Sequence, residues 1–194
     1  MQREEGRLRL LTLREVALAK TVFGGSIDYP RVWVHCDSYL PFGLQRSGTA
    51  MAPNGELYFR KELYMPDFAA LHVTTEIEHL FIHEMMHVWQ HQRGMWVRTR
   101  GLLSWATSYS YMLDGKPMLK YSLEQQAQIV ADYYVLKTYG FDEWDIQRRK
   151  PRPVVTYRGR PDRRTIGGKI PCNACPFSIR THHCAKYQIN HCGL

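Results

Sequence analysis

The most informative stretch of this 194-residue sequence is residues 78–94, which read EHLFIHEMMHVWQHQRG. Most of it belongs to residues 74–93, which contain no Gly or Pro and are followed by Gly94, a pattern typical of one long helix. The apolar residues of this segment recur at intervals of three and four, as on the buried face of a helix; they are Ile77, Leu80, Phe81, Met85, Val88 and Trp89. The sequence therefore predicts a partly buried helix over 74–93.

This predicted helix carries the pattern H-E-x-x-H at residues 83–87. Residues four apart lie on one helix face, so the imidazoles of His83 and His87 can reach one zinc ion. Glu84 lies beside that position, where its carboxylate can accept a proton from an attacking water and pass it to a leaving amine. The pattern indicates hydrolysis of a peptide or amide bond by a zinc-activated water.

Two further histidines, His79 and His91, follow the same spacing along the helix. His79 lies eight residues before His87, and His91 lies eight residues after His83. Eight residues correspond to about 12 Å of helix rise. One metal ion cannot span that distance. We therefore expect His79 and His91 to lie outside the set of metal ligands.

A catalytic zinc needs a third protein ligand, and no histidine occurs between His91 and His182. Ser122-Leu-Glu-Gln125 is a capping box that opens a second predicted helix, ending at Gly140. Glu124 in its first turn is the predicted ligand, although a carboxylate there also stabilises a helix N-terminus. Asp132 is predicted to fix the tautomer of a ligating imidazole, with a surface charge as the alternative. Candidates for a hydroxyl donor to the transition state stay open; they are Tyr109, Tyr111, Tyr121, Tyr133 and Tyr134.

The remainder of the N-terminal region predicts a small sheet and a further helix. Thr12-Leu-Arg-Glu15 is a capping box that precedes a short helix over 16–23. Residues 31–37 alternate as a strand, and Pro53-Asn54-Gly55 marks a hairpin within residues 49–59. The fold class is therefore α+β, with an active-site helix, a small sheet or hairpin and a cysteine-rich C-terminal extension.

The net charge of +8 is unevenly distributed along the chain. Residues 148–194 carry eleven Lys and Arg but one acidic residue, whereas residues 1–147 have a net charge of −2. The basic character therefore belongs to the C-terminal segment, and nucleic-acid binding by the whole chain is disfavoured. We expect a catalytic domain over 1–147 and a basic, Cys- and His-rich extension over 148–194.

Four of the five cysteines lie in this extension. Cys172 and Cys175 have the C-x-x-C spacing of a zinc-binding pair, and Cys184 and Cys192 could complete a second, structural zinc site. Two disulfides, or a tail without fixed structure, are the alternatives. The basic run over 148–164 could contact phosphate, an anionic membrane or an acidic protein, or serve as a solvated linker.

Residues 1–10 have charges where a secretory signal would have an apolar core, and no uncharged run is long enough to cross a membrane. We therefore expect a chain made in the cytoplasm without a signal peptide or a transmembrane segment.

Three stretches of the sequence resemble a known family: residues 78–94, SLEQQAQIVADYY at 122–134 and GELYF at 55–59. They are similar to the zincin metallopeptidase domains attached to type VI secretion spike (VgrG) proteins and to their free-standing relatives. The resemblance implies a zincin fold with a glutamate as third ligand. It places His83, His87 and Glu124 on zinc and makes Glu84 the general base.

The same resemblance implies an antibacterial effector that a contractile apparatus delivers into the periplasm of a competitor. The expected partners are a peptide or protein substrate in the bacterial envelope, an immunity protein and a type VI spike or tube component. One alternative is a DNA-associated metalloprotease with a C-terminal zinc ribbon, but such enzymes have a third histidine soon after H-E-x-x-H. The other alternative is a non-enzymatic, zinc-stapled basic binding module.

Overall fold

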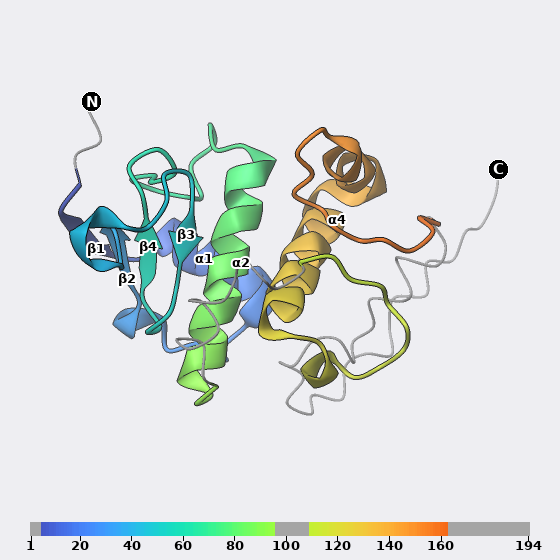
Figure 1. Cartoon of the computed structure of the whole chain (residues 1–194), viewed down its shortest axis with the longest axis horizontal. Helices are drawn as coiled ribbons and strands as arrows, with labels where there is room; N and C mark the ends of the chain where they lie inside the picture. The colour runs from blue at the N-terminus through green and yellow to red at the C-terminus, as the bar shows by residue number, and fades with distance from the viewer. Residues whose placement is uncertain (1–4, 96–108, 163–194) are drawn as a thin grey trace.

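The computed structural model describes residues 5–95 and 109–162, and it has α+β architecture. The described part contains four strands and three α-helices, shown in Figure 1. The strands are β1 (Arg7–Leu10), β2 (Trp33–Cys36), β3 (Ala50–Met51) and β4 (Leu57–Phe59), and the helices are α1 (Leu13–Phe23), α2 (Thr75–Gln92) and α4 (Leu123–Arg149). Three single 3-10 turns, Tyr29–Arg31, Pro41–Gly43 and Met118–Lys120, lie between these elements.

The strands form one mixed sheet in the order β1-β2-β4-β3. β3 and β4 pair antiparallel, which confirms the predicted hairpin, and β2 confirms the predicted strand over 31–37. β4 runs parallel to β2, while β1 pairs antiparallel with β2 at the other edge. The sequence analysis did not predict β1. This strand is only four residues long, RLRL, and three of the four are exposed, so no buried face marks it.

Both capping boxes form as predicted. The Thr12 side chain accepts a hydrogen bond from the backbone amide of Glu15, and the Glu15 carboxylate accepts one from the Thr12 amide. Glu15 also receives two bonds from the Arg9 guanidinium and one from the amide of Phe68. At the start of α4, Ser122 and Gln125 cap each other in the same reciprocal way. These caps fix where α1 and α4 begin.

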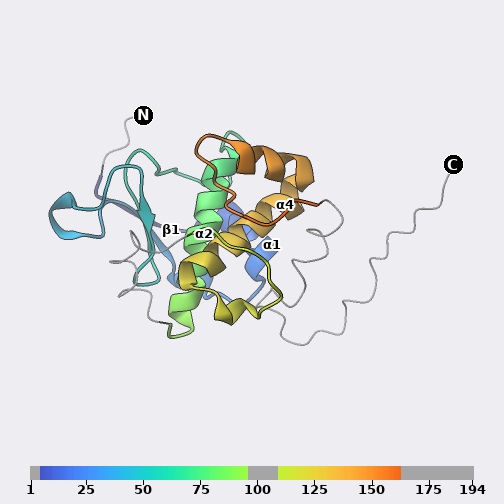
Figure 2. The same cartoon turned by 45° about the vertical axis from the view of Figure 1, so that its right-hand side comes forward.

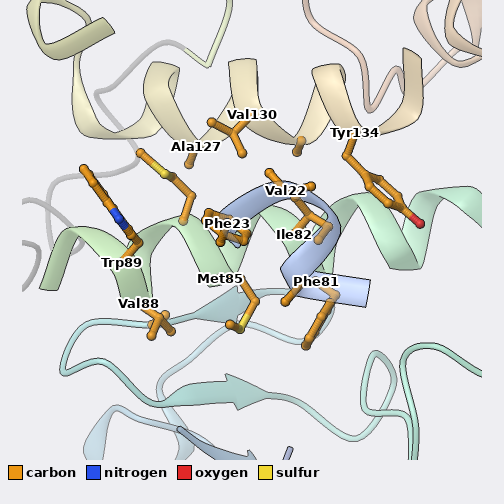
Figure 3. Packing of buried hydrophobic residues seen from close by; sticks show 14 of the residues in the cluster. Val22, Phe23, Phe81, Ile82, Met85, Val88, Trp89, Ala127, Val130 and Tyr134 are labelled. Atoms are coloured by element: carbon orange, nitrogen blue, oxygen red, sulfur yellow. The ribbon is translucent and has the colours of Figure 1, made fainter. Parts of the chain in front are cut away.

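Helix α2 occupies the centre of the described molecule, between the sheet and α4 (Figures 1 and 2). Every residue from Phe81 to Gln90 is buried. In Figure 3, Phe81, Met85 and Val88 of α2 are directed toward the strands, whereas Ala127 and Val130 of α4 face α2 from the opposite side. The helix expected to have one buried face is therefore covered on two sides, and its polar face meets α4 rather than water.

Helix α4 departs from the prediction beyond Gly140. Gly140 has φ 85° and ψ 178°, so it interrupts the helix where a stop was expected, but the chain resumes helical structure up to Arg149. The second part is held by Trp144, which is 1% exposed and packs in the core with Val155 and Tyr157. Residues 150–162 form no helix or named strand, yet Val155 and Tyr157 are buried in the core. No helix in residues 5–95 or 109–162 has the length and apolarity needed to cross a lipid bilayer.

The backbone at Gly140 provides a test of this arrangement. Its φ and ψ are accessible essentially to glycine alone. No side chain would obstruct a Cβ there, so Gly140→Ala changes only the backbone energy. We expect Gly140→Ala to lower the free energy of unfolding by about 1–3 kcal/mol, measured by urea denaturation.

Gly25→Ala is the matched control, because Gly25 has no positive φ and also has open space around its Cα. It should leave the stability unchanged or raise it slightly. Equal unfolding midpoints for the two variants would contradict the strained connection at Gly140.

Candidate metal centre

His83 and His87 of α2 and Glu124 of α4 meet in one cluster. Glu124 Oε2 lies 3.4 Å from His83 Nε2 and 3.2 Å from His87 Nε2. The three potential ligand atoms lie within 4.8 Å of one another. The two imidazole rings are almost perpendicular, with centroids 5.0 Å apart. Both Nε2 atoms thus converge on a single carboxylate oxygen.

The antiparallel packing of α2 against α4 brings these residues together. Glu124 near the start of α4 faces His87 and His83, while Tyr134 further along α4 bonds to Glu78 near the start of α2. The cap at Ser122 fixes the first turn of α4, and Glu124 belongs to that turn. His83 and His87 precede Glu124 by 41 and 37 residues in the chain, and one contact between two helices brings them together.

Burial gives the cluster unusual acid-base properties. Burial lowers the pKa of His83 to about 4, against the opposing effect of Glu124. Burial also acts to lower the pKa of His87, but the Glu124 carboxylate outweighs it and raises that pKa to about 9. Burial acts to raise the pKa of Glu124, but His87 and His83 hold it well below its ordinary value. The site therefore keeps an ionised carboxylate between two imidazoles, an arrangement that favours a cation.

The residues present fit a divalent metal ion such as zinc. Two imidazole nitrogens and one carboxylate oxygen are the protein ligands of one common type of catalytic zinc site. Beside them, Glu84 is 5% exposed, and its Oε2 atom is buried with no hydrogen-bond partner among the described residues. Burial raises the pKa of Glu84 to about 7. Such an unpaired buried atom is costly unless it serves a ligand or a reaction.

Asp132 lies deeper along α4 and contacts His79 instead of His83 or His87. Its Oδ1 atom is 2.7 Å from His79 Nε2, and its Oδ2 atom accepts bonds from the Tyr111 hydroxyl and the Thr156 amide. Eight residues separate Asp132 from Glu124, so it meets the histidine one turn before the H-E-x-x-H pattern. Gln90, and not Asp132, contacts the imidazole of His87, one of the two predicted histidine ligands.

Gln90 was not singled out by the sequence analysis. Its side-chain oxygen lies 2.8 Å from His87 Nδ1, and its side-chain nitrogen donates to the carbonyl oxygen of Leu123. The available signal was its position three residues after His87 in a predicted helix, which places both side chains on one face.

His91, by contrast, is exposed and packs against the turn at Gly55 (φ +83°), where an added Cβ would lie 2.6 Å from the His91 ring.

The structure separates the tyrosines that the sequence left open. The hydroxyls of Tyr111, Tyr121 and Tyr134 bond to Asp132, Asp114 and Glu78, respectively. The Tyr109 ring lies 5.9 Å from the His83 ring, centroid to centroid, and is 40% exposed. The fifth, Tyr133, has the Lys137 ammonium 5.9 Å from its ring centroid. Tyr109 is the candidate whose ring lies beside a member of the His83, His87 and Glu124 cluster. The predicted tail residues Cys172, Cys175, Cys184 and Cys192 lie outside the described residues.

Fold and site together define an α+β domain with a buried His-His-Glu cluster between two antiparallel helices. The solved effector domain of Pseudomonas aeruginosa VgrG2b is 33% identical to the chain, with a TM-score of 0.60. That match covers 80% of this chain and 87% of the solved domain. The chain belongs to the family of the VgrG2b effector domain.

The same relation appears in the sequence of a full-length protein, the type VI secretion system spike protein VgrG2b of P. aeruginosa. The two are 42% identical over an alignment of 137 positions, and the match covers 66% of this chain and 13% of the spike protein. The chain thus spans about an eighth of that relative. No family model matches the chain.

The metal centre can be tested by removing one ligand charge while preserving shape. We expect Glu124→Gln to weaken zinc binding by more than about 100-fold, since even the outer partners of metal ligands contribute 10–100-fold. Binding is measured on the full chain by competition with a chromogenic chelator. Glu143→Gln, on the distal part of the same helix, is the control and should bind as the unmodified chain does. Unchanged affinity of Glu124→Gln would give the third-ligand role to another group.

Proposed function

We propose that the chain is a zinc-dependent hydrolase of peptide or amide bonds, of the zincin type. His83, His87 and Glu124 would hold the metal, and Glu84 would act as general base. The observation that carries the proposal is the buried His-His-Glu cluster with the unpartnered carboxylate oxygen of Glu84 beside it. The zincin comparison rests on the resemblance of residues 78–94 and 122–134 to such domains.

A bound zinc would supply a polarised water whose pKa lies near neutrality. The protein contributes the base. Glu84 Oε2 has no hydrogen bond to give up, so it can accept a proton without breaking an existing contact. Burial raises the pKa of the Glu84 carboxyl group and so favours its uptake of a proton, while the positive charge of a bound metal would favour its release. This is what alternation between base and acid in amide hydrolysis requires.

We further propose that the chain is a type VI secretion effector with an antibacterial role. This proposal extends the family relation to the VgrG2b effector domain and to its spike protein. The contractile apparatus would deliver the domain into the periplasm of a competitor, with a spike or tube component as carrier. A peptide or protein in the envelope would be the substrate, and the producing cell would need an immunity protein.

The charge distribution gives no specific support to the nucleic-acid alternative. Within the described part of the chain, three basic residues at the end of α4 have acidic partners. Arg148 and Arg149 pair with Asp145, and Lys150 pairs with Glu76. Two carboxylates therefore offset part of the charge of these three cations within the domain.

The role of Glu84 is tested by Glu84→Gln, which keeps the size of the side chain but removes its basicity. We expect zinc affinity to be retained while kcat for hydrolysis of a self-quenched fluorescent casein falls by about 10²–10⁴-fold. Glu76→Gln on the same helix is the control, because Glu76 pairs with Lys150 and does not contact the cluster. Retained activity in Glu84→Gln would refute the proposed base.

The biological proposal predicts toxicity that depends on compartment. A bacterium that expresses the chain with an added export signal should stop growing, whereas expression in the cytoplasm should be tolerated. The exported Glu84→Gln variant should be harmless. Growth curves with matched protein levels measure the effect. Equal toxicity in both compartments, or none in the periplasm, would contradict the proposed site of action.

A further inference from the structure

Two side-chain amides lie buried between α2 and the first turns of α4. Gln90 is 0% exposed and Gln126 is 2% exposed. Buried amides are stable only when their donors and acceptors are matched. Gln90 Nε2 lies 3.1 Å from the Leu123 carbonyl oxygen and 3.2 Å from Gln126 Oε1, while Gln126 Nε2 lies 2.9 Å from the Tyr121 carbonyl oxygen. Each of the two amides thus donates a hydrogen bond to a backbone carbonyl oxygen.

These carbonyls fix the direction of the hydrogen bonds. A backbone carbonyl oxygen can only accept, so the nitrogen of Gln126 must face Tyr121 and its oxygen must face Gln90. For the same reason the nitrogen of Gln90 must face Leu123. The oxygen of Gln90 is then left for His87, as the 2.8 Å contact with Nδ1 shows.

This direction determines which nitrogen of His87 carries a proton. Gln90 Oε1 is an acceptor, so His87 Nδ1 must be the donor. In the neutral imidazole, the lone pair is then on Nε2, the atom that faces Glu124 at 3.2 Å. The amide pair therefore selects the tautomer in which Nε2 is available to a metal ion.

The same amide also holds the segment that contains Glu124. Leu123 and Gln126 flank Glu124 in the first turn of α4, and Gln90 bonds to both of them. One side chain thereby joins two of the three members of the cluster. It orients the imidazole of His87 through its oxygen and restrains the turn of Glu124 through its nitrogen.

We propose that Gln90 is the positioning residue of the metal centre, setting the tautomer of His87 and the placement of Glu124 through opposite ends of one amide. This inference rests on the proposed zinc-dependent function and adds to it the residue that organises the ligands. Gln90 does not contact substrate in this role. It acts through the two ligands it connects.

Three variants of the full chain separate the two ends of the amide. Gln90→Leu removes both, and its zinc affinity should fall by about 10–100-fold. Gln90→Glu keeps an acceptor for His87 Nδ1–H but loses the donor to Leu123, so its affinity should lie between those of Gln90→Leu and the unmodified chain. Gln92→Leu is the matched control on α2, because the Gln92 amide bonds only to the backbone of Asp28 among its described contacts. Its affinity should be unchanged.

A spectroscopic readout distinguishes positioning from general stability. In the zinc-loaded protein, the Nδ1–H proton of His87 should give a resonance protected from solvent exchange. The resonance should persist in Gln90→Glu and Gln92→Leu and disappear in Gln90→Leu. Urea denaturation of each variant establishes that it is folded, and Gln90→Glu keeps the test usable if Gln90→Leu does not fold.

The outcomes distinguish this inference from the function on which it rests. If the unmodified chain takes up no zinc, the proposed metal function is wrong. If the unmodified chain binds zinc but Gln90→Leu binds it within twofold as tightly, the metal function stands and the positioning role is wrong. A protected Nδ1–H proton in Gln90→Leu would likewise overturn the positioning role.

Discussion

The contact between α2 and α4 is the constraint on which the site depends. It is lined by polar pairs that run the length of the interface, from Gln90 with Leu123, through His87 with Glu124, to Glu78 with Tyr134. Each buried polar group requires a partner at a fixed position on the other helix. A shift of α4 by one turn along α2 would misplace all of these pairs at once. This row of polar pairs therefore sets the register of α4 against α2, while the sheet and α1 supply apolar contacts on the other sides of α2.

Local signals in the sequence were sufficient for most of the elements. Caps, glycines and hydrophobic spacing act within a few residues, and they correctly located α1, α2, the start of α4 and the hairpin of β3 and β4. The cluster of His83, His87 and Glu124 was also assembled correctly, because two members are joined by helical spacing and the third by a helix start. The chemistry assigned to them remains a prediction.

The remaining features depend on contacts between distant segments. The sequence showed the histidines and carboxylates but not the offset between the two helices, so Asp132 was paired with a ligand when its partner is His79. Nothing in the local sequence distinguishes Gln90 from other helical residues, because its role depends on its contacts with Leu123 and Gln126 of α4. The second part of α4 was missed because its helix is held by Trp144 packing against Tyr157 rather than by periodicity.

The segment after α4, residues 150–162, has a practical meaning for the boundaries of the folding unit. Thr156 donates its amide to Asp132, and the Tyr157 ring packs between those of Tyr111 and Trp144. A truncation placed directly after α4 would strip a buried carboxylate of one donor and open the aromatic cluster to water. A fragment of this domain should therefore extend beyond Tyr157, because residues 156 and 157 contact Asp132 and Trp144 of α4.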